Sequence, residues 1–321
     1  MTMRTKAQLD ELFADNGEGL ITPARLRDLV DSAALLYSFA FGPGTDGPLV
    51  VGAGQTYVNP RISAHTSIHV AAGGTLDLDG YPIMCQTPIT TDGPTSIITS
   101  RAPQPGAPGT AVAGGLAGAF TGIRIYANSF NPGNGGFNGV GAVGGGSTGA
   151  LSELPVPNGA NGGAASGGQV GGLGGTMTTV NGGSGLNGIT LMPLYLLRPQ
   201  GGNNGVPLSG GGAGGGGGAN GAGGGGGGQQ SYGVCIFAPD IQGGGTILAR
   251  GANGGDGFAG SGVGGGGGGG GAGGLVVIVD KVGALRQYVI DNIGGLGGLG
   301  GGFGAQPGQN GQNGPVLLRS V

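Results

Sequence analysis

Tryptophan is absent from this 321-residue chain, aromatic residues make up 5% of it, and charged residues only 8%. Too few bulky side chains remain to bury in the core of an ordinary enzyme. No apolar run approaches the roughly 18 residues that a membrane span requires, which excludes a transmembrane helix. The formal net charge of −3 gives no electrostatic reason to expect nucleic acid as a partner.

Cysteine and cofactor motifs are equally scarce. Cys85 and Cys235 cannot form a disulfide framework or a zinc site, and two separate buried thiols are commoner for such a pair than a disulfide. The string 42–47 matches G-x-G-x-x-G, but Pro48 and a strand-like 49–51 follow where a dinucleotide site needs a helix. No Gly-Lys-Ser/Thr motif occurs, so we expect no cofactor.

Chemistry-bearing residues are sparse in the long C-terminal part of the chain. After residue 105 there are eleven charged residues and no histidine, and no pair of them recurs at a catalytic spacing. The N-terminal MTMRTKAQLDELF lacks the apolar core of a signal peptide, so nothing directs secretion by the general route. The sequence therefore predicts a structural or binding protein and not an enzyme.

What the chain has in abundance is glycine, with 89 residues. Residues 1–100 contain 11 glycines, which leaves 89 − 11 = 78 for residues 101–321. Charge is distributed the other way, because ten of the charged residues lie in the first 31 positions. We therefore expect a helical head at 1–37, a β-rich shaft or collar at 38–104 and a glycine-rich body at 105–321.

The head has the pattern of two short helices, the first capped by Thr5 and the second beginning at Thr22-Pro23. Their apolar faces are Leu9, Leu12 and Phe13 in the first helix, and Leu26, Leu29 and Val30 in the second. A calcium loop starting at Asp15 is excluded, since glycines stand at loop positions 3 and 5 and a leucine stands at position 12. Helices this short bury too little surface to stand alone, so they should dock on copies of themselves or on a larger body.

The string AQLDELFADNGEGLITPARLRDLVDSA (7–33) is similar to N-terminal segments of many bacteriophage fibre and appendage proteins. In those proteins a short helical piece anchors the fibre to the virion. The resemblance implies that the two apolar faces bind another virion protein of the tail baseplate, tail tip or capsid. We expect residues 1–37 to be required for incorporation into virions and not for folding of the body.

Residues 38–101 carry short apolar alternations separated by turn signals. The turn signals are Gly73-Gly74, Asp79-Gly80 and Asp92-Gly93. Their spacing is too tight for large hairpins and indicates stacked short rungs, as in a β-solenoid or a small trimeric β-collar. His65 and His69 are expected near one short strand, in surface or interchain packing and not in a metal site.

Glycine tracts alternate with apolar segments in the body. The tracts are 210–212, 214–218, 223–228 and 264–271, and the apolar segments are 189–197, 234–238 and 275–279. A flexible linker would not contain aliphatic runs, and collagen needs glycine at every third residue throughout. The composition favours a bundle of polyglycine II helices, which are extended threefold helices that rise about 3.1 Å per residue and bond only to their neighbours.

Such a bundle dictates which positions must be glycine. Helices that touch on every side leave no room for a Cβ, so Gly267 in the middle of 264–271 is expected to face neighbours at every angle. Helices with one outward face can carry Gly-Gly-x, as at 254–257 and 294–299, whereas Asn253 is expected in a turn. Ordering glycine costs much backbone entropy, so nearly every backbone group must be paired.

One template recurs along the chain: a short β-like apolar segment runs into a glycine-rich stretch. It begins at Ser96, Gly122, Thr246 and Tyr288, and predicts that strands feed the glycine helices. The segments TLDLDGYPI and TILARGANGGDG, with a glycine tract followed by LVVIV, resemble glycine-rich phage fibres and adhesins. This family includes proteins with a polyglycine II sandwich at the tip, and the resemblance covers roughly residues 60–315.

Rigid glycine helices have few features, so receptor recognition is expected in the loops that join them. The candidate contact residues are Met192, Leu194, Tyr195, Gln229, Gln230 and Tyr232. The last three follow a long glycine tract and are expected to be exposed. The alternative for residues 191–197 is that they are buried between the helices and the strand layer.

The sequence thus predicts a mostly β or irregular fold and a bacteriophage virion fibre protein, structural and adhesive, that binds a host glycan or outer-membrane protein. A homotrimer is expected, because a thin helical head and short rungs bury too little surface in a monomer. One alternative is a head fibre or capsid decoration protein of a phage. A more distant alternative is a glycine-rich ice-binding protein, against which the charged head argues.

Overall fold

The computed structural model describes residues 40–118, 148–150, 160–165, 177–179, 222–260 and 263–321. These residues form β-strands and extended segments, apart from a helical end at residues 40 and 41. The prediction of a mostly β fold is therefore confirmed. The helix pair expected within 1–37 lies outside the described residues.

Fourteen strands form three sheets, in which every neighbouring pair is parallel. Sheet I contains β1 (Pro48–Val51), β4 (Ser67–Val70), β7 (Ile89–Thr91) and β12 (Ile241–Gln242). Sheet II contains β2 (Thr56–Val58), β5 (Thr75–Asp77), β8 (Ile97–Thr99), β13 (Thr246–Leu248) and β15 (Val289–Asp291). Sheet III contains β3 (Ser63–His65), β6 (Ile83–Cys85), β11 (Val234–Phe237), β14 (Val276–Asp280) and β16 (Val316–Ser320). The short strands β9 (Thr148–Ala150) and β10 (Met177–Thr179) pair with each other, also in parallel.

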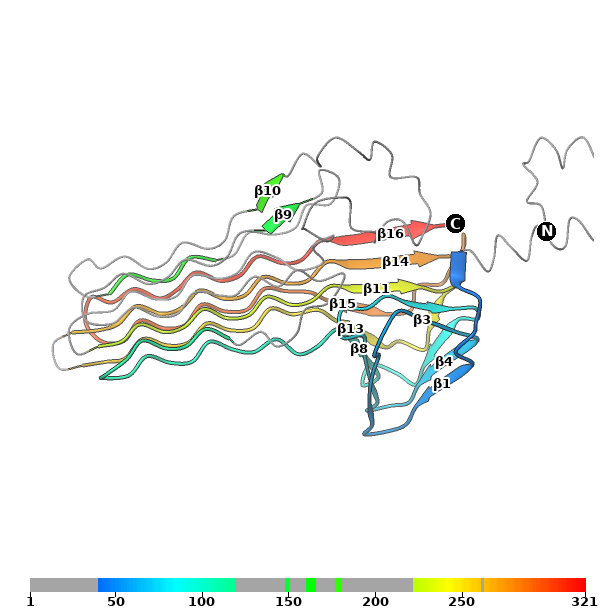
Figure 1. Ribbon diagram of the computed structural model, residues 1–321, viewed down its shortest axis with the longest axis horizontal. Helices are drawn as coiled ribbons and strands as arrows, with labels where there is room; N and C mark the ends of the chain where they lie inside the picture. The colour runs from blue at the N-terminus through cyan, green and yellow to red at the C-terminus, as the bar shows by residue number, and fades with distance from the viewer. Residues whose placement is uncertain (1–39, 119–147, 151–159, 166–176, 180–221, 261–262) are drawn as a thin grey trace, which may run out of the picture.

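As far as β14 the chain visits sheets I, II and III in turn, and each strand pairs with the strand one turn further along. The last turn passes from β14 to β15 without a strand in sheet I. Ile68 in β4, for example, lies between Leu49 of β1 and Ile89 of β7. The product is a three-sided parallel β-helix with short rungs, the solenoid alternative of the sequence analysis (Figure 1). Glycines with positive φ turn the corner from sheet I to sheet II in four successive rungs, at Gly54, Gly73, Gly93 and Gly244.

Aliphatic side chains from all three sheets fill the interior of the β-helix. Its fully buried members include Ile68, Leu76, Ile83, Ile98, Ile236 and Ile247. Cys85 belongs to this interior cluster, whereas Cys235 packs with Phe237 on the opposite face of sheet III. Both thiols are free and buried, as predicted. Sheet III is therefore buried on both faces at β11 and β14, which explains the continuous apolar runs at 234–237 and 276–279.

The glycine-rich segments leave the β-helix at one corner, between sheets II and III. In the first two rungs this corner takes only residues 59–62 and 78–82, whereas in the next three it contains residues 100–233, 249–275 and 292–315. The strands that precede these three excursions, β8, β13 and β15, are neighbours in sheet II, so the template seen in the sequence corresponds to one repeated structural event. The β-helix consequently includes strands from 234–320 as well as from the expected 38–104.

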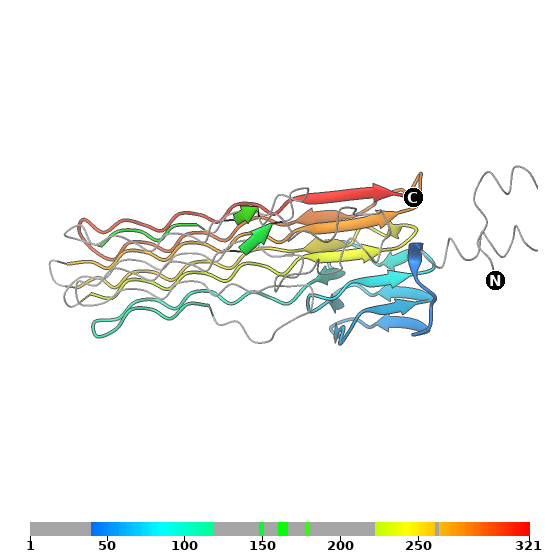
Figure 2. The ribbon, with the colours of Figure 1, turned by 45° about the horizontal axis from the view of Figure 1, so that its top comes forward.

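The described parts of the excursions run side by side as a rod that extends from the β-helix (Figure 2). Their backbone hydrogen bonds have a period of three residues, most clearly in segment 264–275. There, the N–H groups of Gly265, Gly268 and Gly271 donate in order to the backbone carbonyls of Phe258, Gly255 and Ala252. The N–H groups of Gly267, Gly270 and Gly273 donate in order to the backbone carbonyls of Gln306, Gln309 and Gln312. The carbonyls of Gly266, Gly269 and Ala272 accept from Gly225, Gly228 and Ser231. Successive residues thus face different neighbouring segments.

The hydrogen bonds of the rod continue without a break into those of the β-helix. Ser231 N–H donates to Ala272 C=O and Val234 N–H donates to Leu275 C=O, after which β11 and β14 pair as ordinary strands. On the sheet II side, 251–257 pairs with 293–299 before the rod begins to turn back. The rod is therefore a direct extension of sheets II and III.

Two expectations about single residues are wrong. His65 lies in β3 and is buried, whereas His69 lies in β4 of another sheet, because the chain turns a corner between them. Burial lowers the pKa of His65, although its contact with the Gly47 carbonyl opposes this. Asn253 lies in an extended segment and not in a turn, and its Oδ1 accepts the N–H of Leu296 at 2.9 Å.

Candidate functional site at the tip of the rod

Three described turns lie at the end of the rod that is far from the β-helix. They comprise residues 110–113, 258–264 without 261–262, and 301–304. Backbone hydrogen bonds join the turns in one cross-section. The Gly223 N–H donates to the Thr110 carbonyl, and the Gly223 carbonyl accepts the N–H of Phe258. The Gly265 N–H donates to the Phe258 carbonyl, and the Gly301 N–H donates to the Gly265 carbonyl. The turns therefore form one continuous surface, which we call the tip.

The first turn is held by a threonine. Thr110 N–H donates to the Ala113 carbonyl at 2.8 Å, and the Thr110 hydroxyl accepts the N–H groups of Val112 and Ala113. Thr110 thereby satisfies the backbone of the turn with its own side chain. Val112 projects from the turn with 78% of its surface exposed.

The third turn presents an aromatic ring. Gly302 and Gly304 have φ of 75° and 76°, a conformation that favours glycine, and they flank Phe303. A Cβ on Gly302 would lie 3.3 Å from the Val263 carbonyl oxygen, so this turn packs closely against the second one. Phe303 is 92% exposed, the highest value among the large hydrophobic residues that the structure describes.

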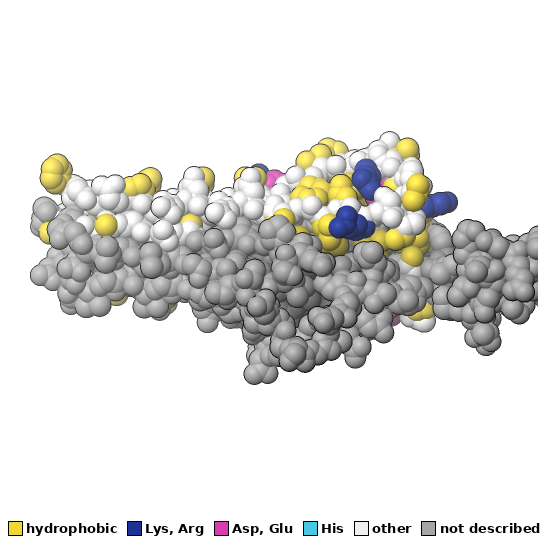
Figure 3. All heavy atoms as spheres, turned by 90° about the horizontal axis from the view of Figure 1, so that it is seen from above, with side chains coloured by type: hydrophobic (Ala, Val, Ile, Leu, Met, Phe, Trp, Pro, Cys, Tyr) yellow, Lys and Arg dark blue, Asp and Glu magenta, His cyan; other side chains and the backbone are white. Residues whose placement is uncertain are grey.

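The chemistry of the tip is apolar and uncharged. No charged residue occurs at 102–118, 257–279 or 292–318. Hydrophobic side chains project along the described part of the rod as far as its end (Figure 3). A neutral surface with an exposed aromatic and exposed aliphatic side chains is suited to binding through apolar contact and hydrogen bonds to backbone groups.

Of the receptor-contact residues proposed from the sequence, the three that the structure describes do not lie at this tip. Gln229, Gln230 and Tyr232 are almost fully buried, so the expectation that they are exposed is wrong. They occupy the base of the rod, where Gln229 Oε1 accepts the N–H of Gln104 and the segment continues into β11. Met192, Leu194 and Tyr195 lie outside the described residues. So do the anchoring candidates Leu9, Leu12, Phe13, Leu26, Leu29 and Val30.

Sequence reasoning missed Val112 and Phe303, although a weak signal existed for each. Phe303 stands alone between glycines and is the only aromatic residue after Tyr288. Val112 is the one bulky residue in the run 106–115. An isolated bulky residue in a glycine-rich stretch has few neighbours of its own type to pack against, so it marks a position that faces outward.

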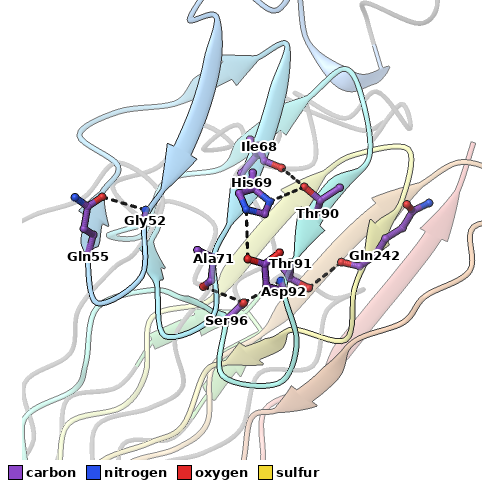
Figure 4. A network of polar contacts seen from close by, with 10 residues as sticks. All are labelled: Gly52, Gln55, Ile68, His69, Ala71, Thr90, Thr91, Asp92, Ser96 and Gln242. Carbon is purple, nitrogen blue, oxygen red and sulfur yellow. Dashed lines mark hydrogen bonds and ion pairs between the residues drawn. The ribbon is translucent and has the colours of Figure 1, made fainter.

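A second set of polar contacts joins the rungs around sheet I (Figure 4). His69 contacts the Thr90 hydroxyl through Nδ1 at 3.0 Å and Asp92 through Nε2 at 3.5 Å. Thr90 in turn donates to the Ile68 carbonyl, so these contacts connect β4 to β7 and to the turn after it. They connect neighbouring rungs, as do the bonds from Thr91 to Gln242 and from Ser96 to Ala71. We assign this network to the stability of the β-helix.

A concavity of about 450 Å³ lies where sheet II meets the rod. Its lining is mainly apolar, with Ile97, Leu248 and Pro103, and also includes Arg250. Arg250 is bonded to Asp291 at 2.7 Å, and this bond raises the pKa of the Arg250 guanidinium. Within the described ranges no group of three His, Cys, Asp or Glu side chains could hold a metal ion, and no helix there could cross a membrane.

No known family model, no curated protein and no solved structure matches this chain. Its function must therefore be argued from its own architecture and surface.

Proposed function

We propose that this chain is a structural and adhesive fibre protein of a bacteriophage virion. In this proposal the β-helix is a rigid base, the three excursions form a polyglycine II rod, and the tip contacts a receptor on the host cell. The protein acts by binding and not by catalysis. The observation that supports this most directly is that all three excursions leave the same corner and that each has a described turn at one uncharged, apolar tip.

The hydrogen-bond pattern supports the polyglycine II assignment. A threefold helix with about 3.1 Å rise turns each third residue to the same neighbour, and segment 264–275 has this period. Its 12 residues would span about 37 Å at that rise. Such a rod is thin and stiff, and it holds a binding surface at a distance from its base.

The positions of the chain ends support attachment through the other end of the molecule. The described chain begins at residue 40 and ends at Val321, and both lie at the side of the β-helix away from the rod (Figure 1). A head anchored to a virion through residues 1–37 would therefore direct the tip outward, toward a glycan or outer-membrane protein of the host.

Binding of labelled full-length protein to a panel of bacterial strains tests adhesion. Burial of an exposed aromatic ring removes roughly 150–250 Å² from water, so we expect Phe303→Ser with Val112→Ser to weaken binding to a recognised strain about tenfold or more. Val282→Ser, an exposed valine beside the base, is the matched control and should bind as the parent does. Binding that is unchanged by the double variant would contradict recognition by the tip.

Imaging of phage particles separates the related functions. A gold label at Val321 should lie close to the particle, since this residue is at the base, and its place on tail or capsid distinguishes a tail fibre from a head fibre or decoration protein. Absence of the protein from virions would contradict the proposal. A thermal-hysteresis assay tests the ice-binding alternative, which predicts a measurable depression of the freezing point.

A further inference from the structure

The outer segment 292–301 carries a row of exposed aliphatic side chains at intervals of three residues. Ile293, Leu296 and Leu299 are 44%, 61% and 67% exposed. Their carbonyls occupy equivalent positions, because they accept the N–H groups of Gly251, Gly254 and Gly257 in succession. Equivalent positions in a threefold helix recur about every 9 Å along one line. We call these three residues the apolar stripe.

Along 294–299 every backbone N–H group is already bonded, so none is left to bind another strand. Asn253 Oδ1 and Asp256 Oδ1 accept the N–H groups of Leu296 and Leu299. Asn313 Oδ1 and Asn310 Oδ1 accept those of Gly294 and Gly297, and the two remaining N–H groups, of Gly295 and Gly298, bond inward to Gly271 and Gly268. A further glycine helix or an extended peptide would find no donor along 294–299. No N–H group of 294–299 is thus available to a covering strand, and the exposed aliphatic side chains are the contact surface that the stripe offers.

We propose that the apolar stripe is the surface through which copies of this chain pack side by side, parallel and in register. The inference rests on the proposed function, in which every copy is anchored at the same end. A second copy carries the same spacing of about 9 Å, so the two stripes stay matched along their length. No charged residue at 292–318 opposes this approach.

The size of the stripe favours a second copy over a partner from solution. A row one side chain wide covers much less than the roughly 800 Å² per partner of a standard interface. Such a small contact is effective when the partners are already held together at one end, because anchoring raises their effective concentration. Copies attached to one virion site meet this condition.

Cross-linking of the full-length protein tests the arrangement directly. Leu296→Cys treated with a short bismaleimide should give linked dimers, whereas Val282→Cys at the base should not. The native thiols make a clean background, because Cys85 and Cys235 are buried and burial raises the pKa of each thiol. A mixture of Ile293→Cys and Leu299→Cys chains should not link to each other, since parallel copies hold these positions about 19 Å apart.

Light scattering supplies the second measurement. At raised protein concentration, which replaces the effect of anchoring, the parent should self-associate, and Leu296→Gln with Leu299→Gln should weaken this association while leaving the melting temperature unchanged, because both side chains are exposed in the single chain. A parent that stays monomeric at raised concentration, equal linking at 296 and 282, linking between 293 and 299, or association unaffected by the double variant would each overturn the proposal. Adhesion through Phe303 and Val112 is measured separately, so either proposal can fail without the other.

Discussion

At the scale of single residues, glycine is required in the rod because of what a Cβ would meet. Along 265–270 the direction of a built Cβ turns from one neighbour to the next with a period of three. From positions 265 and 268 it meets the backbone of Gly223 and Gly226, respectively. From 266 and 269 it meets that of Gly163 and Ala160, and from 267 and 270 that of Gly298 and Gly295. The neighbours are main-chain atoms that are themselves hydrogen-bonded, so they have little freedom to move aside.

We expect Gly267→Val to abolish soluble folding. Its Cβ would collide with the Gly298 carbonyl oxygen and lie 2.9 Å from Gly308 N, so at least one segment would have to move away. Each hydrogen bond lost between segments costs about 1 kcal/mol net, and more where its partner stays buried. Several such losses are decisive against a total stability of roughly 5–15 kcal/mol.

Gln309→Val is the matched control for this change. Gln309 lies in the neighbouring segment with an exposed side chain, so its substitution should alter stability by no more than about 0.5 kcal/mol. Circular dichroism melts of the soluble fractions compare the two variants. Equal melting temperatures for Gly267→Val and the parent protein would mean that the rod is not close-packed.

At the scale of elements, the sequence predicted the strand-to-glycine transitions because they are local. A β-branched run followed by glycine is visible in any window, and β8, β13 and β15 all have it. The pairing of β6 with β11 could not be predicted, because about 150 residues separate them and no local pattern encodes such a contact. Gln229 was misjudged for a related reason: its place after a long glycine tract suggested exposure, but the backbone N–H of Gln104 bonds its side chain inside the protein.

The edge of the rod depends on asparagine side chains that serve as hydrogen-bond acceptors. We expect Asn310→Ala to destabilise the protein by about 0.5–1 kcal/mol, because the N–H of Gly297 loses its partner but remains accessible to water. Asn310→Asp should retain most of the stability, since Asp256 accepts the N–H of Leu299 in the same manner. Urea unfolding midpoints provide the comparison, with Gln309→Ala as the control. Asn310→Ala and Gln309→Ala with the same midpoint would exclude this role for the side chain.

At the scale of the whole molecule, one corner of a β-helix has been extended into a second architecture. Inside the β-helix, stability comes from aliphatic side chains such as Ile68 and Ile236, which are fully buried. In the rod there are few side chains to bury, so order must come from backbone hydrogen bonds that link each segment to several others. The β-helix fixes the starting positions and directions of the excursions, which reduces the entropy that the glycine segments lose on ordering.

This division also explains which parts of the candidate site the sequence could indicate. Composition alone pointed to a rigid glycine body with recognition in its loops, because helices without side chains have little to recognise. It could not say which loops share the tip, since this depends on the direction in which each excursion runs and on where it turns. Val112 and Phe303 are about 190 residues apart, and only the common corner brings their turns to the same end.

Hydrogen–deuterium exchange of the intact protein tests the central claim, that the glycine excursions form an ordered, hydrogen-bonded rod. Cleavage beside Phe258 and Leu275 would isolate the tract 259–275, whose amides include seven glycine donors to two neighbouring segments, 249–258 and 306–312. We expect these amides to be protected to nearly the same extent as those of β14, with which they form one continuous set of hydrogen bonds. Exchange at the rate of an unstructured peptide of the same sequence, with β14 still protected, would contradict the account.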